Sequence, residues 1–252
     1  MKAVILAAGY AVRLRPLTLN TPKPLLPIAN KKIIDRILEK IVPLGCADSI
    51  FVITNARFFG NFNAWSISSR YNKLLNVIDD GTDTNETRLG AIQDLAFGID
   101  KKSIDDDLLV VAGDNLFEFD LKKFLEFAEA HRDGSSIALY DIGDIDLARN
   151  FGVIRIDGSN KVIDFEEKPE NPKCTLVSTG VYYFPKEKVH FVDKYIKIQN
   201  ALDAPGHYIK WLSENDKVYG FKFTEEWFDI GNVDSYNKAD KIYLKKENGK
   251  DE

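Results

Sequence analysis

The first half of the chain alternates short apolar segments with segments whose apolar residues recur at helical spacing. Residues 4–7, 49–54 and 108–112 are short, strongly apolar runs, which is typical of strands buried inside a sheet. Residues 33–42 instead place their apolar side chains on one face of a helix. Strands alternating with helices favour right-handed βαβ units and a largely parallel sheet that helices cover on both faces.

The pattern changes in the second half, where strands follow one another as hairpins do. The strands predicted there are residues 151–157, 162–167, 178–184 and 218–223. A further strand is predicted at 74–78, and further helices at 90–99, 186–199, 208–214 and 233–246. The sequence therefore predicts an α/β protein with a Rossmann-like, mixed and mostly parallel central sheet flanked by helices.

Composition excludes several classes of protein. The chain has 252 residues, of which 44% are hydrophobic and 29% charged, and its net charge is −5, so neither disorder nor non-specific nucleic-acid binding is expected. Its apolar runs are far shorter than a membrane span, and the start has no signal-peptide pattern, so we expect a cytoplasmic protein. With only Cys46 and Cys174 and no CxxC pair, a disulfide framework or zinc site is not expected.

The first 34 residues differ in charge from the rest of the chain. This segment has no Asp or Glu, yet it contains Lys2, Arg13, Arg15, Lys23, Lys31 and Lys32. A cationic segment suits a compact polyanion such as a polyphosphate, although a solvated surface loop would show the same charges. Ligands of open α/β sheets bind beyond the carboxyl ends of strands, so the loops after Ala7 and Ala112 are the first candidates for a site.

The loop after the first strand carries a long motif. Residues 6–18 are LAAGYAVRLRPLT, and residues 22–27 are PKPLLP. Small residues and a glycine let backbone N–H groups approach phosphates, although a lone glycine would equally serve a plain turn. The whole string resembles the signature of the sugar nucleotidyltransferase (NTP transferase) family, LAxGxGxRLxPLTxxxPKxLLPI.

Further segments resemble the later motifs of that family and follow in its order. They are VAGDN at 111–115, FGVI at 151–154, EEKP at 166–169, STGVY at 178–182 and WFDIG at 227–231. The resemblance implies a glycosyltransferase-A-like fold with a small β-rich sugar-binding lobe. It also implies one nucleotidyltransferase domain over 1–252, with the nucleotide in 1–120 and the sugar phosphate in 121–252.

The resemblance also implies a role for each matching charged residue. Asp114 and Asp229 would bind Mg²⁺, the cofactor of the family. Arg13 would hold the β and γ phosphates, Lys23 the α-phosphate, and Lys168 the phosphate of the sugar. No Ser, Cys or His nucleophile is required, because a sugar 1-phosphate is already an anionic nucleophile.

The remaining implied contacts come mainly from small residues. The nucleotide would lie against Leu6, Ala7, Ala8 and Gly9, and its base would contact Asn85 and Gly90. The sugar phosphate would contact Gly152, Glu167, Thr179 and Gly180 besides Lys168. The segment with Asn85 and Gly90 could equally be an ordinary loop with a helix cap.

Two features depart from the family pattern. Ala11 replaces the second glycine of the signature and Val12 replaces a small hydroxylic residue, so a hydroxyl or an unhindered amide is not expected there. The chain also ends soon after Asp229, so neither the β-helix of bifunctional relatives nor the helical extension of longer thymidylyltransferases is expected. The resemblance therefore does not extend to their tetrameric assembly or feedback site, and a monomer or homodimer is expected.

The favoured function is a sugar-1-phosphate nucleotidyltransferase that uses dTTP or UTP with glucose 1-phosphate. The same machinery would accept CTP or GTP with a mannose, heptose or amino-sugar phosphate. A nicotinamide-dependent oxidoreductase is disfavoured because the GxGxxG fingerprint is absent. A non-catalytic nucleotide-sugar-binding regulatory subunit is the alternative from another class, and neither nucleic acid nor membrane is an expected partner.

Overall fold

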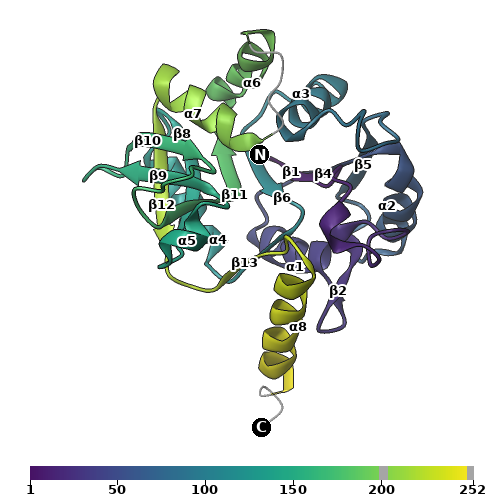
Figure 1. The fold of residues 1–252 in the computed structure, drawn as a ribbon. Helices are drawn as coiled ribbons and strands as arrows, with labels where there is room; N and C mark the ends of the chain where they lie inside the picture. The colour runs from purple at the N-terminus through teal and green to yellow at the C-terminus, as the bar shows by residue number, and fades with distance from the viewer. Residues whose placement is uncertain (199–203, 249–252) are drawn as a thin grey trace.

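A central nine-stranded sheet with helices on both faces organises the chain in the computed structural model, which describes residues 1–198 and 204–248 (Figure 1). The strands along its main path follow the order β10-β9-β11-β6-β1-β4-β5, and β8 pairs with β11 and β12. The strands of this sheet are β1 (Lys2–Leu6), β4 (Ser49–Thr54), β5 (Leu75–Asp79), β6 (Leu108–Ala112), β8 (Ser135–Asp141), β9 (Gly152–Ile156), β10 (Val162–Glu167), β11 (Leu176–Phe184) and β12 (Val218–Phe223).

The first half of the sheet is parallel, as the alternation of strands and helices predicts. β1 pairs in parallel with β4 and β6, and β4 pairs in parallel with β5. β11 then runs antiparallel to β6 and joins the strands of the second half to the same sheet. The predicted fold class, a mixed and mostly parallel sheet flanked by helices, is confirmed. The carboxyl ends of β1, β4 and β6 consequently meet at one edge.

Most of the helices divide between two large hydrophobic cores, one on each face of the sheet, and the short helix Ile145–Ala148 contributes to a third, small cluster. The helices are α1 (Ile33–Ile41), α2 (Ala56–Ser68), α3 (Ala91–Lys102), α4 (Leu121–Ala130), α5 (Ile145–Ala148), α6 (Lys186–Ile198), α7 (Pro205–Asn215) and α8 (Val233–Asn248). Neighbouring residues of a strand point to opposite faces. Ile5 accordingly packs with α1, α2, α4 and α8, whereas Val4 packs with α3, α6 and α7.

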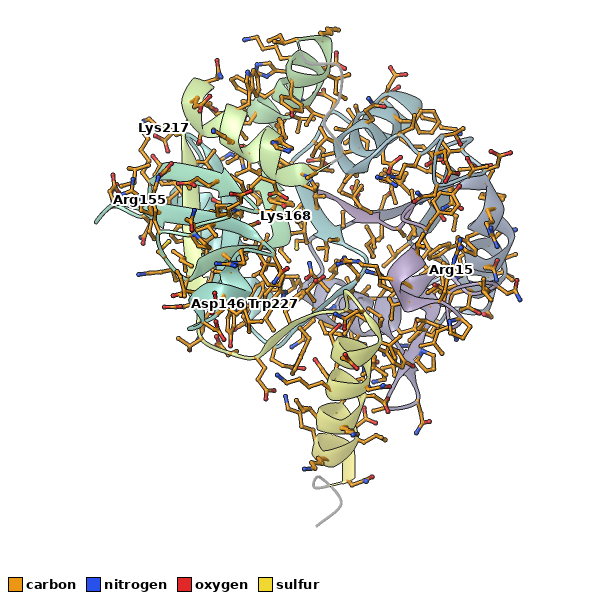
Figure 2. The ribbon with its side chains drawn as sticks, in the orientation of Figure 1. Arg15, Asp146, Arg155, Lys168, Lys217 and Trp227 are labelled. Carbon is orange, nitrogen blue, oxygen red and sulfur yellow. The ribbon has the colours of Figure 1, made fainter. Side chains whose placement is uncertain are left out.

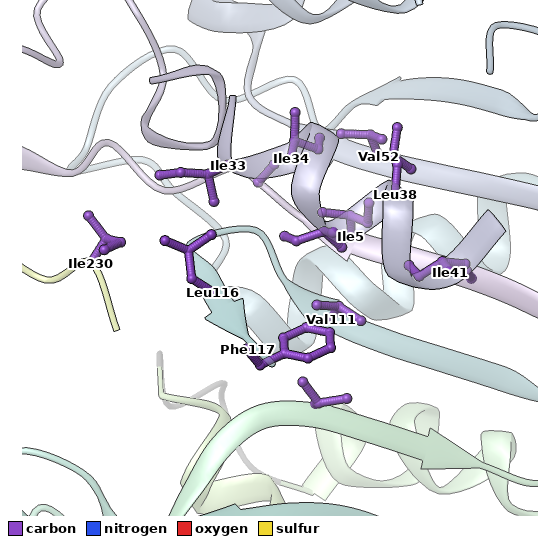
Figure 3. Close-up of a cluster of buried hydrophobic side chains, with 14 of the residues drawn as sticks. Ile5, Ile33, Ile34, Leu38, Ile41, Val52, Val111, Leu116, Phe117 and Ile230 are labelled. Carbon is purple, nitrogen blue, oxygen red and sulfur yellow. The ribbon is translucent and has the colours of Figure 1, made fainter. Parts of the chain in front are cut away.

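Helix α1 shows how the apolar pattern produces this packing. Its apolar residues are fully or almost fully buried, and Figure 3 shows four of them over the strand residues Ile5, Val52 and Val111. A 3₁₀ turn, Val42–Leu44, follows the helix and ends at Gly45, whose φ of 66° suits a glycine. The predicted helix at 33–42 is therefore confirmed.

Several short elements lie outside the predicted set. The 3₁₀ turns Val12–Leu14 and Lys23–Leu25 and the strands β2 (Pro27–Ile28) and β3 (Lys31–Lys32) follow β1. The strands β7 (Asn115–Phe117) and β13 (Trp227–Asp229) pair with each other in a separate antiparallel ribbon. The helix predicted at 186–199 extends over Lys186–Ile198, and Gln199 lies outside the described residues.

Across residues 1–198 and 204–248, no helix has the length and apolar character needed to cross a membrane.

Candidate active site

The loop after β1 is held by backbone hydrogen bonds at the carboxyl edge of the sheet. Ala7 N–H donates to the Ile53 carbonyl at 2.8 Å, and Gly113 N–H donates to the Leu6 carbonyl at 2.8 Å. The Asn55 side chain donates to the Ala8 carbonyl at 2.7 Å. The predicted nucleotide-lining run, Leu6, Ala7, Ala8 and Gly9, therefore starts at a rigid junction of three parallel strands.

Ala11 keeps a conformation that glycine adopts readily. Its φ and ψ are both 46°, in the left-handed region, and the Thr18 hydroxyl donates to its carbonyl at 2.9 Å. Such a conformation costs a non-glycine residue about 1–2 kcal/mol. The departure from the family signature therefore adds a methyl group without removing the left-handed turn that leads into Arg13.

The two predicted metal ligands are neighbours, although they are far apart in the sequence. Asp229 pairs with Asn115 across the β7–β13 ribbon, and Ile230 N–H donates to the Asp114 carbonyl at 3.5 Å. Each ribbon strand has only three residues. The ribbon places the two carboxylates beside the carboxyl end of β6.

Asn115 ties this ribbon to the main sheet. It is 2% exposed, its amide donates to the Thr179 carbonyl at 2.5 Å, and its side-chain oxygen accepts from Trp227 Nε1 at 2.9 Å. Both hydrogen-bonding groups of the side chain are therefore used. These hydrogen bonds hold the ribbon beside Asp114 and Asp229 against β11, a contact that the sequence motif alone did not reveal.

Lys23 forms an ion pair with Asp114. The distance from Lys23 Nζ to Asp114 Oδ2 is 2.8 Å, and the two side chains are 13% and 32% exposed. The 3₁₀ turn of Lys23 packs against Gly113, where an added Cβ would lie 2.8 Å from the Leu6 carbonyl oxygen and 3.1 Å from Pro24 Cγ. Gly113 thus permits the close contact between this turn and the end of β6.

The pKa of the Asp229 carboxyl group is affected by the charges of four other predicted site residues. Burial, and after it the nearby charge of Asp114, raise its pKa to about 6. The charges of Lys23, Arg13 and Lys168 oppose this rise. The structure therefore brings together the residues predicted to bind metal and phosphates: Arg13, Lys23, Asp114, Lys168 and Asp229.

The oxygen ligands present fit a magnesium ion that also binds substrate phosphates. Among residues 1–198 and 204–248, no group of three or more His, Cys, Asp or Glu side chains could hold a metal ion. Mg²⁺ usually binds through one or two carboxylates together with substrate phosphates and water. Asp114 and Asp229 match that donor set, and a cation there would relieve the mutual repulsion of two partly buried carboxylates.

The predicted sugar-phosphate residues lie on the second half of the chain. Figure 2 shows Lys168 on the inner side of this half, toward β1 and β6, whereas Arg155 and Lys217 lie at its outer edge. Lys168 adopts a φ of 46°, and its side chain is 61% exposed with Nζ 3.7 Å from Glu167 Oε1. The lysine is therefore available to an incoming anion.

Glu167 lies in a narrow space between two glycines. Its side chain is only 12% exposed. An added Cβ would lie 3.1 Å from Glu167 Oε2 at Gly152 and 1.8 Å from the same atom at Gly206. Gly152 was predicted from its motif, but Gly206 lies in α7 and no pattern in the sequence pointed to it.

Three further predicted site residues, Thr179, Gly180 and Asn85, each lie against other residues of the protein. The Thr179 hydroxyl is buried and donates to the Ala138 carbonyl at 2.9 Å, so it is occupied within the sheet and does not support the expected sugar contact. Gly180 has a φ of 75° beside Ala112 and Asn115. Asn85 accepts from Arg88 Nη1 at 2.8 Å within the loop before α3.

Gly90 is the N-cap of α3 with a φ of 93°. The structure thus gives Gly90 a helix-cap role, which is the alternative to contact with the base. Contact with the base by Asn85 and Gly90 stays a prediction.

Comparisons with known proteins agree with the fold. Residues 2–246 match the sequence profile of the nucleotidyl transferase family, and the chain belongs to that family. Its relatives by sequence include proteins that are assigned as bifunctional GlmU and as a mannose-1-phosphate guanyltransferase.

Two curated relatives with different assignments match most of this chain. The bifunctional protein GlmU of Methanocaldococcus jannaschii is 32% identical over 98% of this chain and 55% of its own length. A protein of Sulfolobus acidocaldarius assigned as a mannose-1-phosphate guanyltransferase is 30% identical over 92% of this chain and 60% of its own. The chain thus spans a little over half the length of these curated relatives.

A solved structure shares the whole fold. A protein of Bacillus anthracis assigned as a glucose-1-phosphate thymidylyltransferase superimposes with a TM-score of 0.80 at 23% identity, covering 97% of this chain and 95% of that one. This similarity confirms the glycosyltransferase-A-like fold.

The raised pKa of Asp229 predicts a pH dependence of metal binding. A divalent cation binds the carboxylate, so below the pKa of about 6 it must displace a proton. We expect the affinity for Mn²⁺ to be nearly constant above pH 7 and to be about tenfold weaker at pH 5. Electron paramagnetic resonance of free Mn²⁺ would measure this. Asp229→Asn should remove most of the pH dependence, and an equal affinity of the wild type at pH 5 and 7 would contradict the prediction.

The same pKa has an effect of defined sign on the metal-free protein. The folded pKa lies above the value near 3.9 of an unfolded aspartate. The unfolded state therefore loses its proton first as the pH rises, and the contribution of Asp229 to the free energy of unfolding decreases between about pH 4 and pH 6.

Proposed function

We propose that the chain transfers a nucleotidyl group from a nucleoside triphosphate to a sugar 1-phosphate, forming an NDP-sugar and pyrophosphate. The observation that carries this proposal is the grouping of Asp114, Asp229, Lys23 and Arg13 at the end of β6, with the charge of Lys168 also acting on Asp229. Two carboxylates can hold a divalent cation, while three cationic side chains can hold phosphates. This combination suits phosphoryl chemistry between two anionic substrates.

The chemistry needs orientation and charge neutralisation more than proton transfer. An oxygen of the sugar phosphate attacks the α-phosphorus, a new P–O bond forms, and the bond to the β-phosphate breaks to release pyrophosphate. Lys23 neutralises the α-phosphate, Arg13 holds the β and γ phosphates, and Lys168 holds the attacking phosphate. A magnesium ion bound by Asp114 and Asp229 would supply further neutralisation of the transferred group and of the leaving pyrophosphate.

The first substrate pair to test is dTTP or UTP with glucose 1-phosphate. Its support is the likeness of the motifs to glucose-1-phosphate thymidylyltransferases, the enzyme class to which the structural neighbour is assigned. The pair GTP and mannose 1-phosphate is the first alternative, because a relative covering most of this chain is assigned to that reaction. CTP, or a heptose or amino-sugar phosphate, would use the same charged residues. We place the nucleotide in the half 1–120 and the sugar phosphate in 121–252.

A pyrophosphate-release screen tests the proposal. The five common NTPs would be combined with a panel of sugar 1-phosphates, in Mg²⁺ and in EDTA. We expect release only when both substrates are present, a clear preference for one pair, and no release in EDTA. If no pair releases pyrophosphate while an NDP-sugar binds, the chain is instead a non-catalytic regulatory subunit.

A further inference from the structure

The cation expected to act on the α-phosphate is already engaged in the ligand-free protein. Lys23 Nζ lies 2.8 Å from Asp114 Oδ2, and the lysine side chain is only 13% exposed. An ion pair so largely removed from water is screened less than one on the surface. One oxygen of a predicted metal ligand is therefore neutralised before any substrate binds.

The second carboxylate is also close to cationic groups. A Cβ added at Gly231 would lie 3.0 Å from Asp229 Oδ2 and 3.7 Å from Arg13 Nη2, so the guanidinium and this carboxylate border the same small space. The residues assigned to the metal and those assigned to the phosphates thus form one charge-compensated group.

This arrangement disfavours the binding of a divalent cation in the absence of nucleotide. A divalent cation that bound Asp114 alone would lie beside the Lys23 ammonium group, and the lysine would lose its partner without gaining another. The phosphates of a nucleotide offer Lys23 a new anion. Once the lysine contacts the α-phosphate, the Asp114 carboxylate is free to bind the cation.

We propose that Lys23 is the resident counter-ion of Asp114 and withholds this carboxylate from a divalent cation until nucleotide phosphates draw the lysine away. The inference rests on the proposed function, because it uses the phosphate contact assigned to Lys23 there. It makes metal and nucleotide bind cooperatively, with each ligand favouring the other by the same factor. It also keeps the site from holding a metal ion without its substrate.

The test measures the binding of Mn²⁺ alone, without nucleotide, by electron paramagnetic resonance at pH 7.5. Lys23→Met removes the counter-ion, so we expect it to bind Mn²⁺ at least about tenfold more tightly than the wild type, within the usual range of coupling between sites. Lys23→Gln removes the charge but keeps a polar side chain, and it should show the same direction if the methionine variant folds poorly.

Lys40→Met is the matched control. Lys40 pairs with Glu118 at 3.0 Å, the two side chains are 31% and 32% exposed, and Glu118 directly follows β7. We expect its Mn²⁺ affinity to stay within about twofold of the wild type, because its partner is not one of the predicted metal ligands. Unchanged or weaker Mn²⁺ binding in both Lys23 variants would overturn the proposal, as would equal tightening in Lys40→Met. Either result leaves the pyrophosphate-release test of the proposed function unaffected.

Discussion

Asp114→Asn and Asp229→Asn are each expected to lower the turnover number by at least about 100-fold, the scale seen when a preorganised charge-stabilising group is removed. Asparagine has nearly the volume of aspartate, so the β7–β13 ribbon should keep its packing. It lacks the negative charge that holds a divalent cation. The variants should therefore fold normally, bind metal poorly and neutralise the transition state badly.

Steady-state rates of pyrophosphate release at saturating substrates, together with thermal unfolding, would check this expectation. Asp105→Asn is a suitable control. Asp105 lies before β6 and pairs with Lys186, at the opposite end of the strand that leads to Asp114. Its loss removes an exposed carboxylate without touching the site, so turnover should stay close to that of the wild type. Near-wild-type turnover in Asp114→Asn or Asp229→Asn would contradict the metal assignment.

Gly206→Ala is expected to raise the KM for the sugar phosphate by about tenfold to 100-fold, with little change in the KM for the nucleotide. A methyl group there would overlap Glu167 Oε2, since the Cβ would lie only 1.8 Å away. The carboxylate is the mobile end of its side chain and would rotate out of its present place. Its hydrogen bonds to a sugar would then be lost, while the nucleotide half stays unchanged.

Separate titrations of the two substrates in the release assay would distinguish these effects. Gly158→Ala is the matched control, because no atom outside its immediate chain neighbours lies within 4 Å of a Cβ placed there. It should leave both KM values unchanged. If Gly206→Ala leaves the KM for the sugar phosphate unchanged, Glu167 does not contact the sugar from its present position.

Strands and helices with a regular apolar pattern were predictable, because the pattern reflects which of their sides are buried. β4 and β12 were predicted at their observed bounds, because most of their residues are buried and their sequences are correspondingly apolar. β8 was not predicted. It begins with Ser135 and Ser136, which are buried although polar, so the apolar pattern on which the prediction depends is interrupted at its start.

The sequence by itself determined which charged groups this protein has and the order of its motifs, because a long signature and buried strands are local properties of the chain. Only the tertiary structure decided which of these groups meet. The ribbon that joins Asp114 to Asp229 consists of two three-residue strands, too short to leave a pattern, and it depends on the buried hydrogen bonds of Asn115. The pairing of Lys23 with Asp114 and the contact of Glu167 with Gly206 likewise arise from packing between distant segments. No local propensity encodes such contacts.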